Sequence, residues 1–180
     1  MPGAEPTLAV TLYAAPLKGD HFAYSLQKAT EIGAAAFVPI LTARTVANEA
    51  SATKLERWRR IAREAAEQSG RGMIPPVAAP RPFAEACRDA VAAGPALIPW
   101  EEERAGGLRA ALASRAAAHG RPARLGLFIG PEGGFTASEV AAARDVGIIP
   151  VTLGRRILRA ETAAAVATTL ALVAAGDLDP

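Results

Sequence analysis

Short apolar runs alternate along the chain with longer stretches in which apolar and polar residues recur at the spacing of a helix. The runs contain few polar positions, which is typical of strands that are buried on both faces of a sheet. We expect these strands at residues 8–13, 37–41, 96–99, 125–129 and 148–153. Their regular alternation with helices predicts an α/β fold with a mostly parallel sheet and helices on both faces.

Capping residues indicate where the intervening helices begin and end. Asp20 and Thr53 are suited to cap two of them, and Pro82 suits the first turn of a third. Thr136 and Glu139 have the spacing of a capping box, and a glycine follows most of the predicted helices. The six helices predicted in this way, caps included, span residues 20–33, 53–70, 82–94, 105–119, 136–147 and 161–176.

Length and composition are those of one soluble domain. A chain of 180 residues can bury a core without disulfides, and Cys87 is its single cysteine, so a reducing, cytoplasmic setting is expected. No basic segment precedes an apolar one near the N-terminus, and the apolar stretch 162–175 is too short to cross a membrane. We expect residues 1–7 to be a linker and residues 8–176 to form the domain.

The charge of the chain permits nucleic acid as a partner without arguing for it. The net charge is only +2, but 17 of the 20 basic residues are arginine, whose planar fork suits phosphate. A GC-rich genome would explain the same bias, together with the many alanines. The positions of the arginines are therefore more informative than their number.

A glycine-rich turn follows the predicted strand 125–129. Its sequence, Gly-Pro-Glu-Gly-Gly over residues 130–134, leads directly into the capping box at Thr136. Ligands of open α/β sheets bind beyond the carboxyl ends of the strands, and glycine lets a ligand approach the backbone closely. A tight strand–helix turn without a ligand would have the same composition, so this segment alone leaves both interpretations open.

An arginine-rich loop follows the last predicted strand. Arg155, Arg156 and Arg159 precede a helix that opens near Glu161. Glutamate is favourable in a first helical turn, but arginines gain nothing there, so their placement indicates an anionic partner. Pro99-Trp100-Glu101 ends a third strand and by itself says little.

Several other kinds of site are excluded by the motifs that the chain lacks. There is no Gly-Lys-Ser or Gly-Lys-Thr of a P-loop and no GxGxxG of a dinucleotide fold. His21 and His119 lie far apart, so zinc spacing is absent and we expect no metal. No Gly-x-Ser-x-Gly is present, and Cys87 lies within a helical pattern, so a serine or cysteine nucleophile has no support.

The basic helix at 53–70 is best explained as a solvated face. Arg57, Arg60 and Glu64 share one side of this helix, opposite Trp58 and Ile61. The segment at its end, Glu-Gln-Ser-Gly-Arg over residues 67–71, is more suggestive of a binding site, as is Arg44 after the second strand.

These motifs together resemble a known family. GPEGG followed by TASEV, then LGRRILRAETA and an alanine-rich final helix, is similar to the signature of the SPOUT methyltransferases. QKATEIG at 27–33 and EQSGRG at 67–72 narrow the resemblance to the RsmE family, which methylates N3 of a uridine in bacterial 16S ribosomal RNA. Ala160 stands where the family motif has threonine.

The resemblance implies features that composition cannot show. Members of the family have a C-terminal trefoil knot, a rare arrangement, and form homodimers. They carry a PUA-like RNA-binding domain ahead of this region, for which the sequence contains no counterpart. The implied methyl donor is S-adenosylmethionine and the implied partner is 16S rRNA or the small ribosomal subunit, with no membrane involved.

The resemblance also implies roles for individual residues. Arg159 and Arg156, then Arg71 and Arg44, are candidates to stabilise charge on the target base, and Glu161 and Glu132 are the candidate bases. The residues expected to contact the methyl donor are Pro99, Ile129, Gly130, Pro131, Glu132, Gly133, Leu153, Gly154, Ile157, Leu158 and Ala163. Those expected to contact RNA are Arg44, Gln68, Arg71 and Arg155.

Two other functions stay open at this point. Another SPOUT enzyme, acting on tRNA or on a ribose 2′-hydroxyl, would share these motifs. A non-catalytic dimeric RNA-binding module would keep the fold, although an intact donor loop argues against it.

Overall fold

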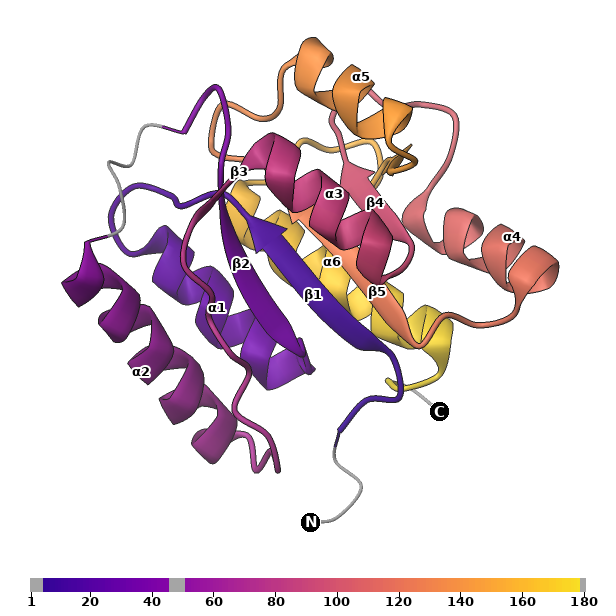
Figure 1. The fold of residues 1–180 in the computed structure, drawn as a ribbon. Coiled ribbons are helices and arrows are strands. Elements are labelled where there is room, and N and C mark those ends of the chain that lie inside the picture. Colours follow the sequence, from indigo (N-terminus) through magenta and orange to yellow (C-terminus); the bar gives the residue numbers. More distant parts are fainter. Residues whose placement is uncertain (1–4, 46–50, 179–180) are drawn as a thin grey trace.

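A sheet of six parallel strands forms the centre of the molecule (Figure 1). The computed structural model describes residues 5–45 and 51–178. The strands lie in the order β3-β2-β1-β5-β4-β6. Their bounds are β1 Ala9–Ala14, β2 Ala36–Leu41, β3 Arg81–Pro82, β4 Ala96–Pro99, β5 Arg124–Ile129 and β6 Ile149–Val151.

The central strands are buried on both sides, as their continuous apolar sequences require. Leu12 of β1 pairs with Phe37 of β2 on one side and with Leu127 of β5 on the other. All three side chains are at most 2% exposed. The apolar runs of the sequence therefore correspond to the middle of the sheet.

Six helices cover the two faces of this sheet (Figure 1). α1, α2, α4 and α6 pack over one face, where Val10, Leu125 and Leu172 lie in a single core. α3 and α5 pack over the other, around Phe128 and Ile98. The helices are α1 His21–Ile32, α2 Ala52–Gln68, α3 Phe83–Ala93, α4 Leu108–His119, α5 Ala137–Asp145 and α6 Ala160–Ala175.

The predicted α/β class, parallel sheet and two-sided helical cover are confirmed, and most predicted bounds lie within a few residues of those observed. β3 was missed because it contains only two residues, both exposed, and one of them is proline. The last strand is shorter than predicted: it ends at Val151, and Thr152 pairs instead with the segment that precedes α4.

One predicted helix cap is wrong and another is right in position only. Asp20 is the N-cap residue of α1 as predicted, but its side chain makes no cap bond and forms an ion pair with Arg57 at 2.7 Å. α2 begins two residues earlier than Thr53 implied, with the side chain of Ser51 accepting a hydrogen bond from the backbone of Lys54. The capping box of Thr136 and Glu139 is present as predicted.

The chain leaving β6 runs parallel to the segment that precedes α4. The backbone of Thr152 accepts a hydrogen bond from Leu108 and donates one to Gly106, so the two segments run side by side before α6 begins. The trefoil knot itself stays a prediction.

The start of the sheet is tied to the end of the last helix. The carboxylate of Asp177 accepts hydrogen bonds from the backbone of Thr7 and Leu8 and from the Thr7 hydroxyl, all at 2.8–2.9 Å.

Within the described residues, no helix is both long and apolar enough to cross a membrane.

Candidate methyl-donor site

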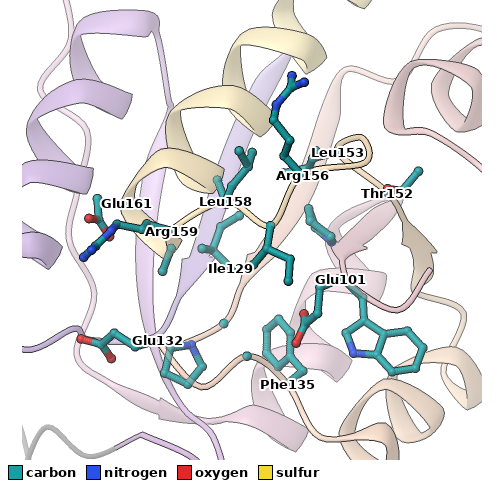
Figure 2. Close-up of a pocket in the computed structure, with 18 of the residues that line it drawn as sticks. Glu101, Ile129, Glu132, Phe135, Thr152, Leu153, Arg156, Leu158, Arg159 and Glu161 are labelled. Carbon is teal, nitrogen blue, oxygen red and sulfur yellow. The ribbon is translucent and has the colours of Figure 1, made fainter. Parts of the chain in front are cut away.

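A pocket of about 520 Å³ lies beyond the carboxyl ends of β4, β5 and β6. Most of its walls come from three loops that are far apart in the sequence: the turn after β5, the loop before α6 and the segment after β4. Lys18 and His21, from the loop after β1 and the start of α1, also line it. Figure 2 shows Ile129, Leu158 and Phe135 in the middle of the site. Glu132, Arg159 and Glu161 lie on one side, and Glu101 and Thr152 on the other.

The turn after β5 needs two of its glycines for shape. A Cβ on Gly130 would come within 3.2 Å of the Phe135 ring, which is itself buried. Gly134 has a φ of +68°, and the carboxylate of Glu101 occupies the place where its Cβ would be. The capping box then holds α5 directly behind the turn. The sequence GPEGG thus builds a compact wall with accessible backbone.

Glu132 is held in an ionised state within this turn. One of its carboxylate oxygens accepts a hydrogen bond of 2.7 Å from the backbone N–H of Lys18, at the end of the β1–α1 loop. Burial by itself would raise the pKa of the carboxyl, but this bond and the charge of Lys18 outweigh burial, and the pKa of Glu132 is lowered. Glu132 therefore presents a stable negative charge and is a weak proton acceptor.

The loop after β6 presents three arginines whose side chains are unpaired within the part of the chain that the structure describes. Thr152 shapes its start, because the threonine hydroxyl bonds both the N–H and the carbonyl of Gly154, whose φ is +119°. Among the described residues, the side chains of Arg155, Arg156 and Arg159 make no hydrogen bond or ion pair. In Figure 2 the side chain of Arg156 points away from the pocket, whereas Arg159 points toward the side where Glu161 lies.

Glu161 meets a histidine from another helix. Its carboxylate lies 3.3 Å from Nδ1 of His21, which is the first residue of α1. The side chain of Glu161 is 14% exposed and that of His21 is 52% exposed. The starts of α1 and α6 therefore meet at the pocket through this pair.

Hydrogen bonds and an ion pair of Glu103 stabilise the segment after β4. The buried carboxylate of Glu103 accepts hydrogen bonds from the backbone of Arg104 and Ala105 and pairs with Arg144 at 2.8 Å. The bond from Ala105 is the main reason that the pKa of Glu103 is lowered, against the effect of burial. In the same segment Nε1 of Trp100, a pocket residue, is buried without a hydrogen-bond partner.

The structure brings most of the predicted site residues together. Of the predicted donor contacts, only Gly133 does not line the pocket. Its carbonyl oxygen instead accepts a hydrogen bond of 2.5 Å from Arg44, and a Cβ at Gly133 would meet the Arg44 side chain. The four predicted catalytic residues, Arg156, Arg159, Glu132 and Glu161, and the predicted RNA contact Arg155 all line the pocket.

Three of the four predicted RNA contacts do not line the pocket: Arg44, which bonds Gly133, and also Arg71 and Gln68. The side chain of Arg71 is 4% exposed and donates to Glu5 and to the carbonyl oxygens of Thr30 and Ala34. It is thus engaged inside the domain and is not at the pocket, so its predicted contact with the target base does not fit this structure. Gln68 lines a separate groove between α1 and α2.

Several pocket residues were not predicted from the sequence. They are Lys18, His21, Trp100, Glu101, Arg104, Gly134, Phe135, Thr152 and Ala160. Trp100 and Glu101 follow a predicted strand, but their position alone indicated no role for them. Nothing local in the sequence marks Lys18 or His21, because they reach the pocket only through the packing of β1 beside β5.

Other kinds of chemistry find no support at this site. Burial raises the pKa of the Cys87 thiol to about 12, so this group is not a nucleophile. In residues 5–45 and 51–178, no three His, Cys, Asp or Glu side chains come together in a way that could hold a metal ion.

The fold and the pocket define a class of protein: a parallel α/β domain with a ligand site built from a glycine turn and an arginine loop. A family model described as the RNA methyltransferase domain matches residues 4–172, and the chain belongs to this family.

Within this family, the chain is similar to proteins named ribosomal RNA small subunit methyltransferase E. The chain is 45% identical over 166 residues to ribosomal RNA small subunit methyltransferase E of Synechocystis sp., a match that covers 91% of this chain and 52% of the relative. It is 39% identical to the protein of the same name from Mycobacterium tuberculosis, over 88% of this chain and 60% of the relative. The chain thus spans about half the length of the curated relatives it matches.

Solved structures agree with these sequence relatives. A ribosomal RNA small subunit methyltransferase E from Neisseria gonorrhoeae, solved with bound S-adenosyl methionine, superposes with a TM-score of 0.79 at 34% identity. That match covers 91% of this chain and 65% of the other. A SpoU methyltransferase from Streptomyces viridochromogenes has the same fold at 16% identity, with a TM-score of 0.55.

Proposed function

We propose that this chain is the catalytic domain, residues 8–176, of an enzyme that methylates N3 of a uridine in 16S ribosomal RNA with S-adenosylmethionine as donor. The observation that carries the proposal is the pocket itself. Both C-terminal motifs line one cavity, and so do Arg155, Arg156 and Arg159, whose side chains have no partner within residues 5–45 and 51–178. The similarity to small subunit methyltransferase E proteins supports the substrate, and the cytoplasm, where ribosomes are assembled, is the proposed location.

The pocket fits the proposed donor in size and chemistry. Its volume of about 520 Å³ lies in the range of roughly 300–1,000 Å³ that is usual for small-molecule sites. Apolar side chains such as Ile129 and Leu158 can cover an adenine ring, while the backbone at Leu153 and Gly154 can bond its edge. The carboxylates of Glu101 and Glu132 suit hydroxyl and ammonium groups, respectively.

When bound, S-adenosylmethionine supplies an electrophilic methyl group on a sulfonium. The residues of this chain then have three tasks. The loops must hold the methyl in line with N3, because correct orientation lowers the barrier. A base must take the N3 proton, because a neutral imide is a poor nucleophile. Arg159 is placed to stabilise the charge that spreads to the flanking carbonyl oxygens.

Two measurements test this proposal. Calorimetry of the chain with S-adenosylmethionine should show one site per chain, and a Gly130→Val variant, which drives a side chain into Phe135, should lose it. Mass spectrometry of 16S rRNA after incubation should show one added methyl at a uridine base. Methylation of tRNA or of a ribose would instead assign another SPOUT activity, and absence of donor binding would favour a non-catalytic RNA-binding module.

We also propose that the chain acts as a homodimer. α6 is apolar over most of its surface, and Val166 and Val173 are only partly buried within one chain. A second copy packed on this face would cover them. Sedimentation at micromolar concentration tests this, and a monomer would contradict it.

A further inference from the structure

Two acidic side chains in the pocket are candidates to take the proton from the target base, and their surroundings differ. Glu132 accepts a backbone hydrogen bond from Lys18 through one oxygen, and its pKa is lowered. A carboxylate whose charge is stabilised in this way is a weak base. It is better suited to hold a positive group than to accept a proton.

Glu161 has a different environment. Its polar contact within the described residues is with a side chain, Nδ1 of His21, at 3.3 Å from Oε1. Oε2 has no protein partner among those residues. The side chain is largely buried at the start of α6, on the pocket side where Arg159 also lies (Figure 2). One oxygen is therefore held and the other is left for a ligand.

His21 is placed to control the orientation of this carboxylate. It is the first residue of α1, and α1 packs against α6, so both ends of the pair stand on rigid elements. A flexible glutamate has three rotatable bonds, and a nitrogen 3.3 Å from one carboxylate oxygen favours one arrangement of them. The neighbouring Asp20 does not compete for His21, because it pairs with Arg57.

We propose that His21 is a positioning residue for methyl transfer: its imidazole holds the carboxylate of Glu161 so that Glu161 accepts the proton from N3 of the target uridine. This proposal rests on the function proposed above and assigns its base. His21 itself does not touch the reacting atoms.

The step balances in atoms and charge. The N3–H bond breaks, and its proton goes to the free oxygen of Glu161. The electron pair left on N3 forms the new bond to the methyl carbon. The bond between that carbon and sulfur breaks with its pair remaining on sulfur, so one carboxylate and one sulfonium are neutralised together. The products are N3-methyluridine and a neutral thioether.

The test compares two substitutions of His21 in the full chain. His21→Leu removes the partner of Glu161, and we expect kcat for 16S rRNA to fall about 30-fold, below the range of roughly 10²–10⁴ for complete loss of a general base. Donor affinity by calorimetry should stay within about threefold, because the loops that hold the donor are unchanged. His21→Lys keeps a nitrogen donor that can reach Glu161, so it should restore most of kcat.

A double-mutant cycle makes the test specific. Glu161→Gln should lower kcat at least as much as His21→Leu, and combining the two should cost little more, since both remove the same function. The matched control is His119→Leu at the exposed end of α4, which should change neither kcat nor donor affinity.

Three outcomes would overturn the proposal. Full activity in His21→Leu would show that the pair is not needed. Equal loss in His21→Lys and His21→Leu would show that His21 acts in some way other than by holding the Glu161 carboxylate. Additive losses in the double variant would show that the two residues act separately. Failure of the wild-type chain to methylate 16S rRNA would instead refute the proposed function, and this inference with it.

Discussion

Two arginine-rich regions of this molecule are alike in sequence and opposite in structure. The arginines of α2 and its exit are nearly all neutralised by carboxylates of the same chain. Those of the loop between β6 and α6 make no such contact among the described residues. The pairs of the first region are Arg57–Asp20, Arg59–Glu56, Arg60–Glu64 and Arg71–Glu5.

Basic residues mark a binding site when the fold leaves them without a partner. An unpaired guanidinium beside a pocket retains its full attraction for a phosphate or a developing negative charge. The charge of a paired guanidinium is instead compensated by a carboxylate within the domain. Substitutions in the two regions should therefore affect different properties.

The largest expected effect is on stability, at Arg71. Its side chain is 4% exposed and bonds Glu5 and two backbone carbonyls. Arg71→Ala should reduce the free energy of unfolding by about 3 kcal/mol, because it leaves these acceptors without a partner. Urea denaturation measures the loss. Donor affinity of the folded fraction should be unchanged, and a fall in that affinity would place Arg71 at the site after all.

The next largest effect is on catalysis, at Arg159. Arg159→Ala should reduce the single-turnover rate of methyl transfer about 100-fold, as for loss of one donor to a developing oxyanion. The free energy of unfolding should change by less than about 0.5 kcal/mol, since the side chain has no partner to lose. RNA binding in a filter assay should weaken less than transfer. Unimpaired transfer would remove Arg159 from the catalytic group.

A smaller effect is expected on the pH dependence of stability, through the pair of Arg71 with Glu5. The hydrogen bond from Arg71 is the largest influence on Glu5 and lowers its pKa from the ordinary 4.5. A carboxyl with a lowered pKa contributes stability above pH 4.5, and this contribution is lost as pH falls through the folded value. Stability of the wild type should thus fall more steeply than that of Arg71→Ala between pH 5 and pH 3. Parallel curves from urea denaturation would contradict the assigned pair.

The smallest effect is expected on the exposed side of α2. Arg60 lies 3.8 Å from Glu64, and both side chains are about two-thirds exposed. Arg60→Ala should change the free energy of unfolding by less than about 0.5 kcal/mol, as is usual for exposed pairs. Methyl transfer and donor binding should match the wild type. A clear loss of RNA binding would show that α2 contacts the substrate.

Much of the fold was accessible from the sequence because its signals are local and strong. Continuous apolar runs identified the five longer strands, and the capping box at Thr136 was visible from residue spacing alone. Asp20 was correctly placed at the N-cap of α1, but the loss of its side-chain cap bond could not be predicted, since its partner Arg57 is 37 residues away.

The site was predictable only where its residues lie on a motif. Backbone around Gly130 and Gly154 was found because glycines follow predicted strands. The pair of His21 with Glu161 spans 140 residues and depends on how α1 packs against α6, which no local pattern encodes. Arg71 was misjudged because its burial depends on contacts with Glu5, Thr30 and Ala34, which are all remote in sequence.

The link between Asp177 and the start of β1 has a consequence for the order of events during synthesis. Domains emerge from the ribosome N-terminus first, so β1 and α1 are exposed long before their last partner exists. α6 packs against α1 and α4, and Asp177 receives the N–H groups of Thr7 and Leu8. The apolar face beneath α6 thus stays uncovered until α6 itself has emerged. Closure of this domain joins the segments of the domain that are synthesised first and last.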